Sequence, residues 1–179
     1  MSVSVGVLAI QGGFQKHAEM LESLGVEVKL VKFTNDFDEI DRLIIPGGES
    51  TALLNLLTKH QIFDKLQDFC SQNPVFGTCA GSIILSKGSQ YLSLIDLEVE
   101  RNGYGRQVDS FVTNLGFMGN SIKAVFIRAP KFTRVGDNID VLAKFDDLPV
   151  LVRQGNILVS SFHPELTEDS SVHKYFLNM

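Results

Sequence analysis

The sequence predicts an α/β fold with a mostly parallel central sheet and some antiparallel strands in its second half. Strand-like and helix-like segments alternate through the first half of the chain, a pattern typical of parallel strands joined by helices. The first strand, residues 3–10, is almost wholly apolar, as expected when both faces of the sheet are covered. After Leu94 the alternation gives way to short strand-like segments joined by polar turns, which predict the antiparallel strands.

The first half supplies its elements in order. Apolar residues at helical spacing predict a helix over 14–24, which Gly25 is expected to end. Ser50 is expected to cap the next helix. Cys70 lies in the apolar stripe of the helix after that, so we expect it to pack in the core. The expected order is strands at 3–10, 26–31 and 43–45, helices at 14–24, 50–57 and 62–70, and an apolar run that stops at Gly77.

The second half predicts mainly strands. Short apolar segments are separated by polar turns, and the chain closes with apolar residues at helical spacing, Val172, Phe176 and Met179. We therefore expect a final helix. The expected strands lie near 97–101, 107–113, 124–127, 139–145, 150–154 and 157–160.

Composition limits the class of protein. The 179 residues suit one domain, residues 1–179, with 44% hydrophobic and 21% charged residues. A net charge of −5 gives no reason to expect a nucleic acid or an anionic membrane as partner. The N-terminus does not read as a signal peptide, and no apolar run is long enough to span a bilayer. Two cysteines make no disulfide framework, so we expect a reducing, cytoplasmic setting.

The segment from Pro74 to Leu85 carries the strongest chemical signal. A short apolar run stops at Gly77, presents Cys79, passes Gly81 and continues as an apolar helical segment. This is the pattern of a nucleophile elbow, with cysteine where many hydrolases have serine. A helix N-terminus favours an anion, and the thiolate is the reactive form of cysteine. On its own the pattern also fits a small buried cysteine beside a tight turn.

A base for this cysteine is expected near the end of the last strand. Pro164 biases His163 toward an extended conformation, in which residues i and i+2 point the same way. Glu165 would then accept a hydrogen bond from one imidazole nitrogen, while the other nitrogen faces Cys79. The three residues would form a set of nucleophile, base and orienting acid. The alternative is a strand-end histidine beside a solvated glutamate. The other histidines, His17, His60 and His173, are expected on the surface.

The glycine-rich loops should gather at one edge of the sheet. Ligands of open α/β sheets lie beyond the carboxyl ends of the strands, and three loops fall there: residues 11–13, 46–50 and 77–80. No cluster of His, Cys or Asp has metal-ligand spacing. We therefore expect neither a metal nor a cofactor.

These residues resemble a known family. Gly77–Gly81 with His163-Pro-Glu165 resembles the class I (triad-type) glutamine amidotransferases, whose fold is a three-layer, flavodoxin-like α/β sandwich. Within them the chain looks like the glutaminase subunits of two-component pyridoxal 5′-phosphate synthases, the PdxT/SNO family. The similarity extends over nearly the whole chain and is carried further by residues 6–12, 46–51, 99–110, 126–130 and 161–168.

The resemblance implies hydrolysis of L-glutamine to L-glutamate and ammonia, with the ammonia passed to a partner synthase subunit. It implies that Cys79 is the nucleophile, His163 the acid and base, and Glu165 the orienting residue. The isolated glutaminase is then expected to be poorly active, because the family depends on its synthase to order the oxyanion loop. Oxyanion donors are expected at Gly47, Gly48 and Ala80, and glutamine contacts at Gly47, Gly48, Glu49, Arg106, Ile127 and Arg128.

The expected contacts make chemical sense for an amino acid ligand. Arg106 or Arg128 would bind the α-carboxylate, and Glu49 would help to hold the polar ligand. Without the motif, each arginine would be read as a surface ion pair. Two other functions remain open: a glutaminase subunit for a different synthase, such as that of histidine biosynthesis, or a flavodoxin-like binding module with an inert elbow.

Overall fold

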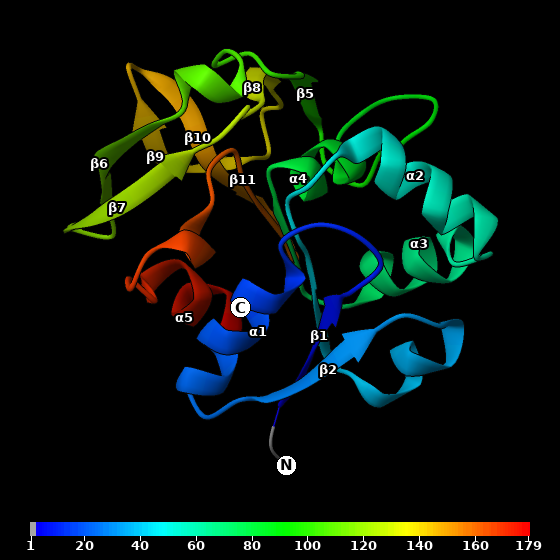
Figure 1. Cartoon of the computed structure of the whole chain (residues 1–179). Coiled ribbons are helices and arrows are strands. Elements are labelled where there is room, and N and C mark those ends of the chain that lie inside the picture. The colour runs from blue at the N-terminus through cyan, green and yellow to red at the C-terminus, as the bar shows by residue number, and fades with distance from the viewer. Residues whose placement is uncertain (1–2) are drawn as a thin grey trace.

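The computed structural model describes residues 3–179, except for the side chain of Gln107. It has a seven-stranded sheet in the order β2-β1-β3-β4-β11-β10-β9 and two separate two-stranded ribbons, β5-β8 and β6-β7 (Figure 1). The strands are β1 (Ser4–Leu8), β2 (Glu27–Val31), β3 (Arg42–Ile45), β4 (Val75–Thr78), β5 (Leu97–Glu100), β6 (Phe111–Phe117), β7 (Asn120–Phe126), β8 (Lys131–Val135), β9 (Asp140–Phe145), β10 (Leu148–Gln154) and β11 (Ile157–Ser160). The helices are α1 (Phe14–Ser23), α2 (Ser50–Lys59), α3 (Phe63–Gln72), α4 (Ala80–Leu85) and α5 (Ser171–Leu177), with 3₁₀ turns η1 (Thr34–Glu39), η2 (Gln107–Asp109) and η3 (Pro164–Leu166).

The main sheet confirms the predicted fold class. Strands β2, β1, β3, β4 and β11 pair in parallel, whereas β10 pairs antiparallel with both β11 and β9. The antiparallel part therefore comes from the second half of the chain, as predicted. The alternating βα pattern of the first half supplies β1, β2, β3 and β4 of the parallel part, because parallel neighbours need a crossover connection, and β11 from the second half completes it.

The sheet is the middle of three layers, and alternating residues of its strands enter two different cores. In β3, Leu43 and Ile45 face the core beneath α2, α3 and α4, while Ile44 faces the core beneath α1 and α5. In β4, Val75 and Phe76 divide in the same way. Because both faces are buried, these strands need apolar residues at every position, which is why they read as continuous apolar runs.

Several elements differ from the sequence predictions. The predicted strand at 107–113 begins instead with η2, and the segment near 124–127 belongs to the longer strand β7. Strand β8 and the turn η1 were not predicted. Apart from a few buried anchors such as Phe37 and Phe132, both segments are largely open to solvent, so they carry only a weak apolar period.

Helix α2 is capped by Glu49 rather than by Ser50, contrary to the prediction. The Glu49 carboxylate accepts hydrogen bonds from the backbone N–H groups of Thr51 and Ala52, at 3.1 and 2.7 Å, and Ser50 is the first helical residue. Glutamate reaches the free N–H groups of the first turn and complements the helix dipole. Among residues 3–179, no helix has the length and apolar character needed to cross a membrane.

Parallel pairing brings the candidate site together. Thr78 at the end of β4 lies beside Ser160 at the end of β11, and Ile45 at the end of β3 lies beside Gly77. The residues that follow these strands therefore leave the sheet at one edge. Cys79 and the segment containing His163 meet there, next to the loop after β3, as the sequence predicts for a ligand site.

Candidate active site

Cys79 occupies a strained turn between β4 and α4. Its backbone has φ 48° and ψ −105°, a conformation that L-residues rarely adopt. Strain of this kind persists only where the surrounding structure enforces it, and it concentrates at functional sites. Gly81 shows one source of the constraint: a Cβ atom there would collide with the carbonyl oxygen of Ile45. The helix therefore packs directly on β3, and the turn is as tight as the elbow pattern predicts.

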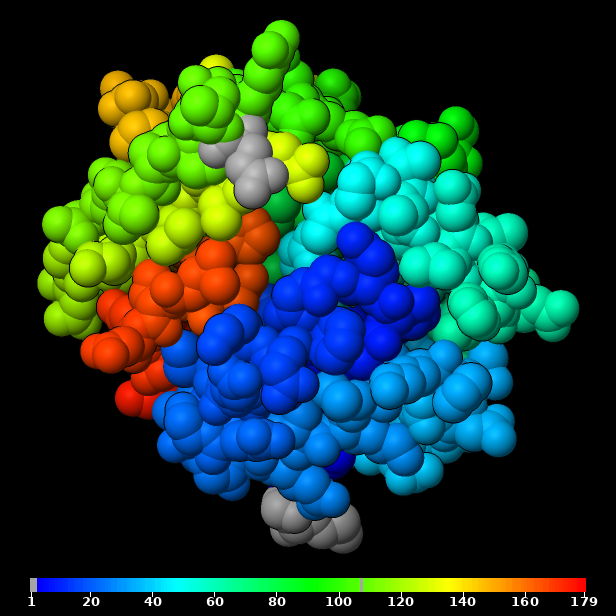
Figure 2. Space-filling model, in the orientation of Figure 1, coloured from blue at the N-terminus to red at the C-terminus, as the bar shows by residue number. Residues whose placement is uncertain are grey.

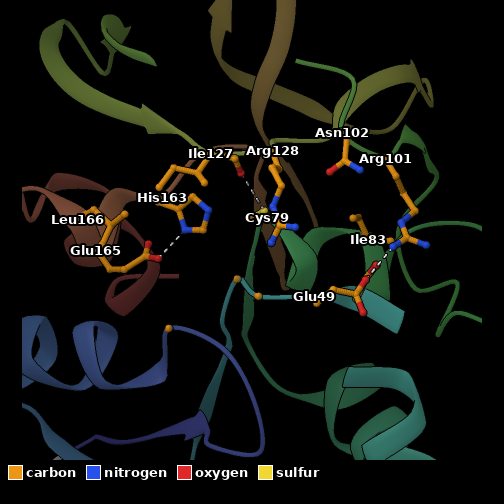
Figure 3. A pocket seen from close by; sticks show the side chains of 14 residues that line it. Glu49, Cys79, Ile83, Arg101, Asn102, Ile127, Arg128, His163, Glu165 and Leu166 are labelled. Atoms are coloured by element: carbon orange, nitrogen blue, oxygen red, sulfur yellow. Dashed lines mark hydrogen bonds and ion pairs between the residues drawn. The ribbon is translucent and has the colours of Figure 1, made fainter. Parts of the chain in front are cut away.

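In the view of Figure 3, His163 lies between Cys79 and Glu165. His163 Nδ1 is 2.7 Å from Glu165 Oε1, and His163 and Cys79 are close neighbours, since a Cβ atom on Gly47 would lie 3.1 Å from His163 Nδ1 and 3.2 Å from Cys79 Cβ. His163 is non-helical, as predicted for a residue before proline, but Glu165 lies in η3 rather than in an extended segment. The 3₁₀ turn folds the carboxylate back toward the imidazole, so the predicted contact forms through a different backbone path.

The electrostatics of the three side chains favour a charged pair. Burial alone would lower the pKa of His163, but its interactions with Cys79 and Glu165 outweigh that effect and raise the pKa to about 10. Burial would likewise raise the pKa of Glu165, yet its hydrogen bond with His163 and the charge on that imidazole hold the pKa below its usual range. The arrangement therefore favours a protonated His163 paired with the Glu165 carboxylate.

A cavity of about 270 Å³ opens over Cys79. In Figure 2 the segments that line it meet on one face: the loop before α1 in dark blue, the start of α2 in cyan and the segment around His163 in orange. This volume is at the small end of ligand cavities, so it suits a single amino acid better than a nucleotide. Its lining residues are Gly13, Gly47, Gly48, Glu49, Ser50, Cys79, Ile83, Arg101, Asn102, Ile127, Arg128, His163, Glu165 and Leu166.

The charged groups in the cavity only partly match the sequence expectation. Glu49 and Arg128 line it as expected (Figure 3). Arg106 is exposed and is not one of the lining residues. Arg101, which sequence reasoning did not single out, lines the cavity instead and places Nη2 2.8 Å from Glu49 Oε1. The sequence did point to the region of Arg101, because this residue lies in the 99–110 segment that carries the family resemblance.

Backbone groups at the cavity include possible oxyanion donors. Ala80 is the first residue of α4, so its N–H has no acceptor within the helix. The Gly47 carbonyl accepts from the N–H of Gly13 at 2.9 Å. Because the peptide is trans, the N–H of Gly48 points away from the loop before α1. Ile127 contributes its carbonyl oxygen, 3.9 Å from Cys79 Sγ.

Two histidines predicted to be on the surface are buried. His17 and His173 have no exposed surface, and their rings are hydrogen-bonded at 3.0 Å. His17 stands three residues after Phe14 and four before Leu21, so it belongs to the apolar face of α1. The same spacing places His173 with Phe176 in α5. His60 is exposed, as predicted, and Cys70 is buried in the core.

The fold and the site define a class of protein: an α/β amidotransferase or hydrolase with a cysteine elbow backed by a His–Glu pair. Residues 7–179 match the model of the SNO glutamine amidotransferase family. The chain therefore belongs to the SNO glutamine amidotransferase family.

Individual relatives agree with this assignment. The chain is 72% identical over all 179 residues, covering both proteins completely, to "Pyridoxal 5′-phosphate synthase subunit PdxT" of Francisella tularensis subsp. novicida strain U112. A crystal structure of a glutamine amidotransferase is 47% identical, with a TM-score of 0.91 over 97% of each chain. The structure of PurLQS from Thermotoga maritima, 17% identical with a TM-score of 0.74 over 99% of each chain, shares the fold.

Proposed function

We propose that this chain is the glutaminase subunit of a pyridoxal 5′-phosphate synthase. It hydrolyses L-glutamine to L-glutamate and ammonia, and it delivers the ammonia to a synthase subunit for vitamin B6 biosynthesis. The observation that carries the proposal is that Cys79, at a strained strand-to-helix turn, shares the cavity with the hydrogen-bonded pair of His163 and Glu165. The full-length identity to a protein named as a pyridoxal 5′-phosphate synthase subunit supports this particular synthase.

The first half of the reaction forms a thioester. The Cys79 thiolate adds to the side-chain carbonyl carbon of glutamine, and the carbonyl oxygen becomes an oxyanion. The C–N bond then breaks as the imidazolium of His163 gives its proton to the departing nitrogen, which leaves as ammonia. The raised pKa of His163 suits this role, because the proton is already on the ring when the substrate arrives.

The second half regenerates the enzyme. Neutral His163 takes a proton from water as the oxygen adds to the thioester carbon, and the C–S bond breaks to release glutamate and the Cys79 thiolate. Glu165 accepts the Nδ1–H bond of His163 throughout, which fixes the ring orientation. The N–H groups of Ala80 and of Gly47 or Gly48 stabilise the oxyanion in both halves, and loss of one such donor typically costs about 10²- to 10³-fold in rate.

The cavity is lined by side chains of both charges, which suit the α-carboxylate and the α-ammonium group of an amino acid. Arg128 and Arg101 are the arginines of the lining, and Glu49 adds a carboxylate. A guanidinium would bind the α-carboxylate of glutamine, and Glu49 would attract its α-ammonium group. In the described structure Glu49 already pairs with Arg101 and caps α2, so glutamine has to share these contacts. Arg106 would join the contacts only if the segment around it moves toward the cavity.

The experiment is a coupled assay with the purified synthase. Glutamine as the nitrogen source should support pyridoxal 5′-phosphate formation, and glutamine hydrolysis should be slow without the synthase. Cys79→Ser should abolish formation from glutamine but leave formation from an ammonium salt intact. Cys70→Ala, which changes the core cysteine, should retain glutamine hydrolysis. Full glutaminase activity in Cys79→Ser would refute the mechanism, and a hydrolysis rate unaffected by the synthase would count against the proposed partner.

This proposal also includes the setting of the protein. A reactive Cys79 that is not in a disulfide is best preserved in a reducing compartment, so we place the enzyme in the cytoplasm. The chain acts as one glutaminase domain, residues 1–179, in a hetero-oligomer with its synthase. Fractionation of cells followed by the coupled assay tests the location.

A further inference from the structure

A series of buried polar groups continues behind Glu165, away from the cavity. The second carboxylate oxygen, Oε2, lies 3.4 Å from Nε2 of His17 in α1. The same Nε2 is 3.1 Å from the hydroxyl of Thr78 in β4, and His17 Nδ1 is 3.0 Å from Nε2 of His173 in α5. Elements far apart in the sequence thus meet behind the candidate triad, where α1 and α5 lie on the same side of the sheet (Figure 1).

Burial makes these contacts consequential. His17, Thr78 and His173 are completely buried, and Glu165 is 5% exposed. A carboxylate at this depth favours donors beside both of its oxygens. His163 supplies the donor for Oε1. Oε2 has no hydrogen-bond partner among the described residues, and Nε2 of His17, 3.4 Å away, is the nitrogen that lies within ion-pair distance of it.

The neighbours also determine which nitrogens carry protons. Burial lowers the pKa values of His17 and His173, so both rings are neutral and each has one N–H. If His173 donates from Nε2 to His17 Nδ1, then His17 carries its proton on Nε2, facing Glu165 and Thr78. The opposite tautomers would point a lone pair of His17 at the carboxylate and leave the buried Nδ1–H of His173 without an acceptor.

We propose that His17 is a positioning residue of the glutaminase reaction: hydrogen-bonded to Thr78, its Nε2–H lies beside Oε2 of Glu165 and restrains the carboxylate electrostatically, and His173 holds it in the required tautomer. This inference rests on the proposed function of the site. Glu165 fixes the orientation of His163, so a carboxylate that can rotate would misdirect the imidazole. His17 is separated from the cavity by Glu165, so its loss should reduce kcat and leave KM for glutamine nearly unchanged.

Three variants separate positioning from packing. His17→Leu removes the donor, whereas His17→Gln keeps an N–H donor and an acceptor on a side chain of similar reach. Phe76→Leu is the matched control, because the Phe76 ring packs edge-on against His17 and His173, with centroids 6.2 and 5.9 Å away, yet donates no hydrogen bond to them. Thermal unfolding of each variant reports whether the fold is intact.

With synthase and glutamine, His17→Leu should lower kcat by about 10- to 100-fold, the range for losing an outer hydrogen-bond partner, with KM within about threefold. His17→Gln should recover most of the loss, and Phe76→Leu should stay within about threefold of wild type. Equal losses in His17→Leu and Phe76→Leu, or no loss in His17→Leu, would overturn the inference.

A second measurement does not depend on glutamine turnover. Alkylation of Cys79 by iodoacetamide at pH 7, followed by mass spectrometry, should be about tenfold slower in His17→Leu and nearly unchanged in Phe76→Leu. Wild type that reacts rapidly at Cys79 but hydrolyses no glutamine with the synthase would refute the proposed function alone. Alkylation rates that are identical in all variants would refute the role of His17.

Discussion

Gly47→Ala is the substitution whose effect the structure specifies most directly. A Cβ atom at position 47 would lie 3.1 Å from His163 Nδ1 and 3.2 Å from Cys79 Cβ, and it would collide with His163 Cε1 well inside 3.0 Å. Real Cβ atoms essentially never approach that closely. The imidazole or the glycine loop must therefore move by roughly 1 Å, and a misplacement of that size near reacting groups can cost about 10²-fold in rate.

The assay is glutamine hydrolysis in the presence of the synthase, with Gly116→Ala as the matched control. An added Cβ at Gly116 in β6 meets no atom within 4 Å, so that variant should keep wild-type kinetics. Gly47→Ala should lose about two orders of magnitude in kcat and still fold, because its clash is confined to the edge of the cavity. A kcat within threefold of wild type would refute the assignment of His163 as the group that must stay in place.

Two further predictions concern stability. Glu49→Ala should lower the free energy of unfolding by about 1 kcal/mol through loss of the cap of α2, whereas Ser50→Ala loses no cap; equal costs in urea unfolding would contradict this difference. Because the pKa values of His17 and His173 are lowered in the native chain, the unfolded chain binds protons at acidic pH that the native chain does not. As the pH drops below 6.5, the free energy of unfolding should therefore decrease by up to about 1.4 kcal/mol per pH unit for each histidine. The raised pKa of His163 acts in the opposite sense, and its contribution should be lost as the pH rises from 6.5 toward 10; a flat profile in urea unfolding from pH 4 to 10 would contradict both effects.

The parts of the fold that could be predicted are those with local causes. The parallel strands could be recognised because both faces are buried, which makes them apolar throughout. The elbow could be recognised because a tight turn needs small residues around Cys79, and His163 because proline restricts it. By contrast, β8 and η1 depend on partners elsewhere in the chain, and only Phe37 and Phe132 mark them in the core.

The parts of the site that were missed depend on tertiary structure. Arg101 reaches Glu49 across 52 positions, and His17 reaches His173 across 156. A histidine is expected on the surface because its side chain is polar. Only its spacing to apolar neighbours, together with a buried hydrogen-bond partner, indicates that it lies in the core. Arg106 was predicted from a motif but lies outside the cavity lining. A motif identifies a residue but does not fix where its side chain lies in the isolated chain.

The most direct test of the central claim is labelling by a glutamine analogue that carries an electrophilic carbon in place of the side-chain amide. The wild-type chain, mixed with its synthase, should be labelled once, at Cys79, with loss of glutaminase activity in proportion to labelling. Cys70 serves as an internal control, because it is completely buried. Labelling that leaves Cys79 unmodified, or full glutaminase activity after Cys79 is modified, would contradict the assignment of Cys79 as the nucleophile.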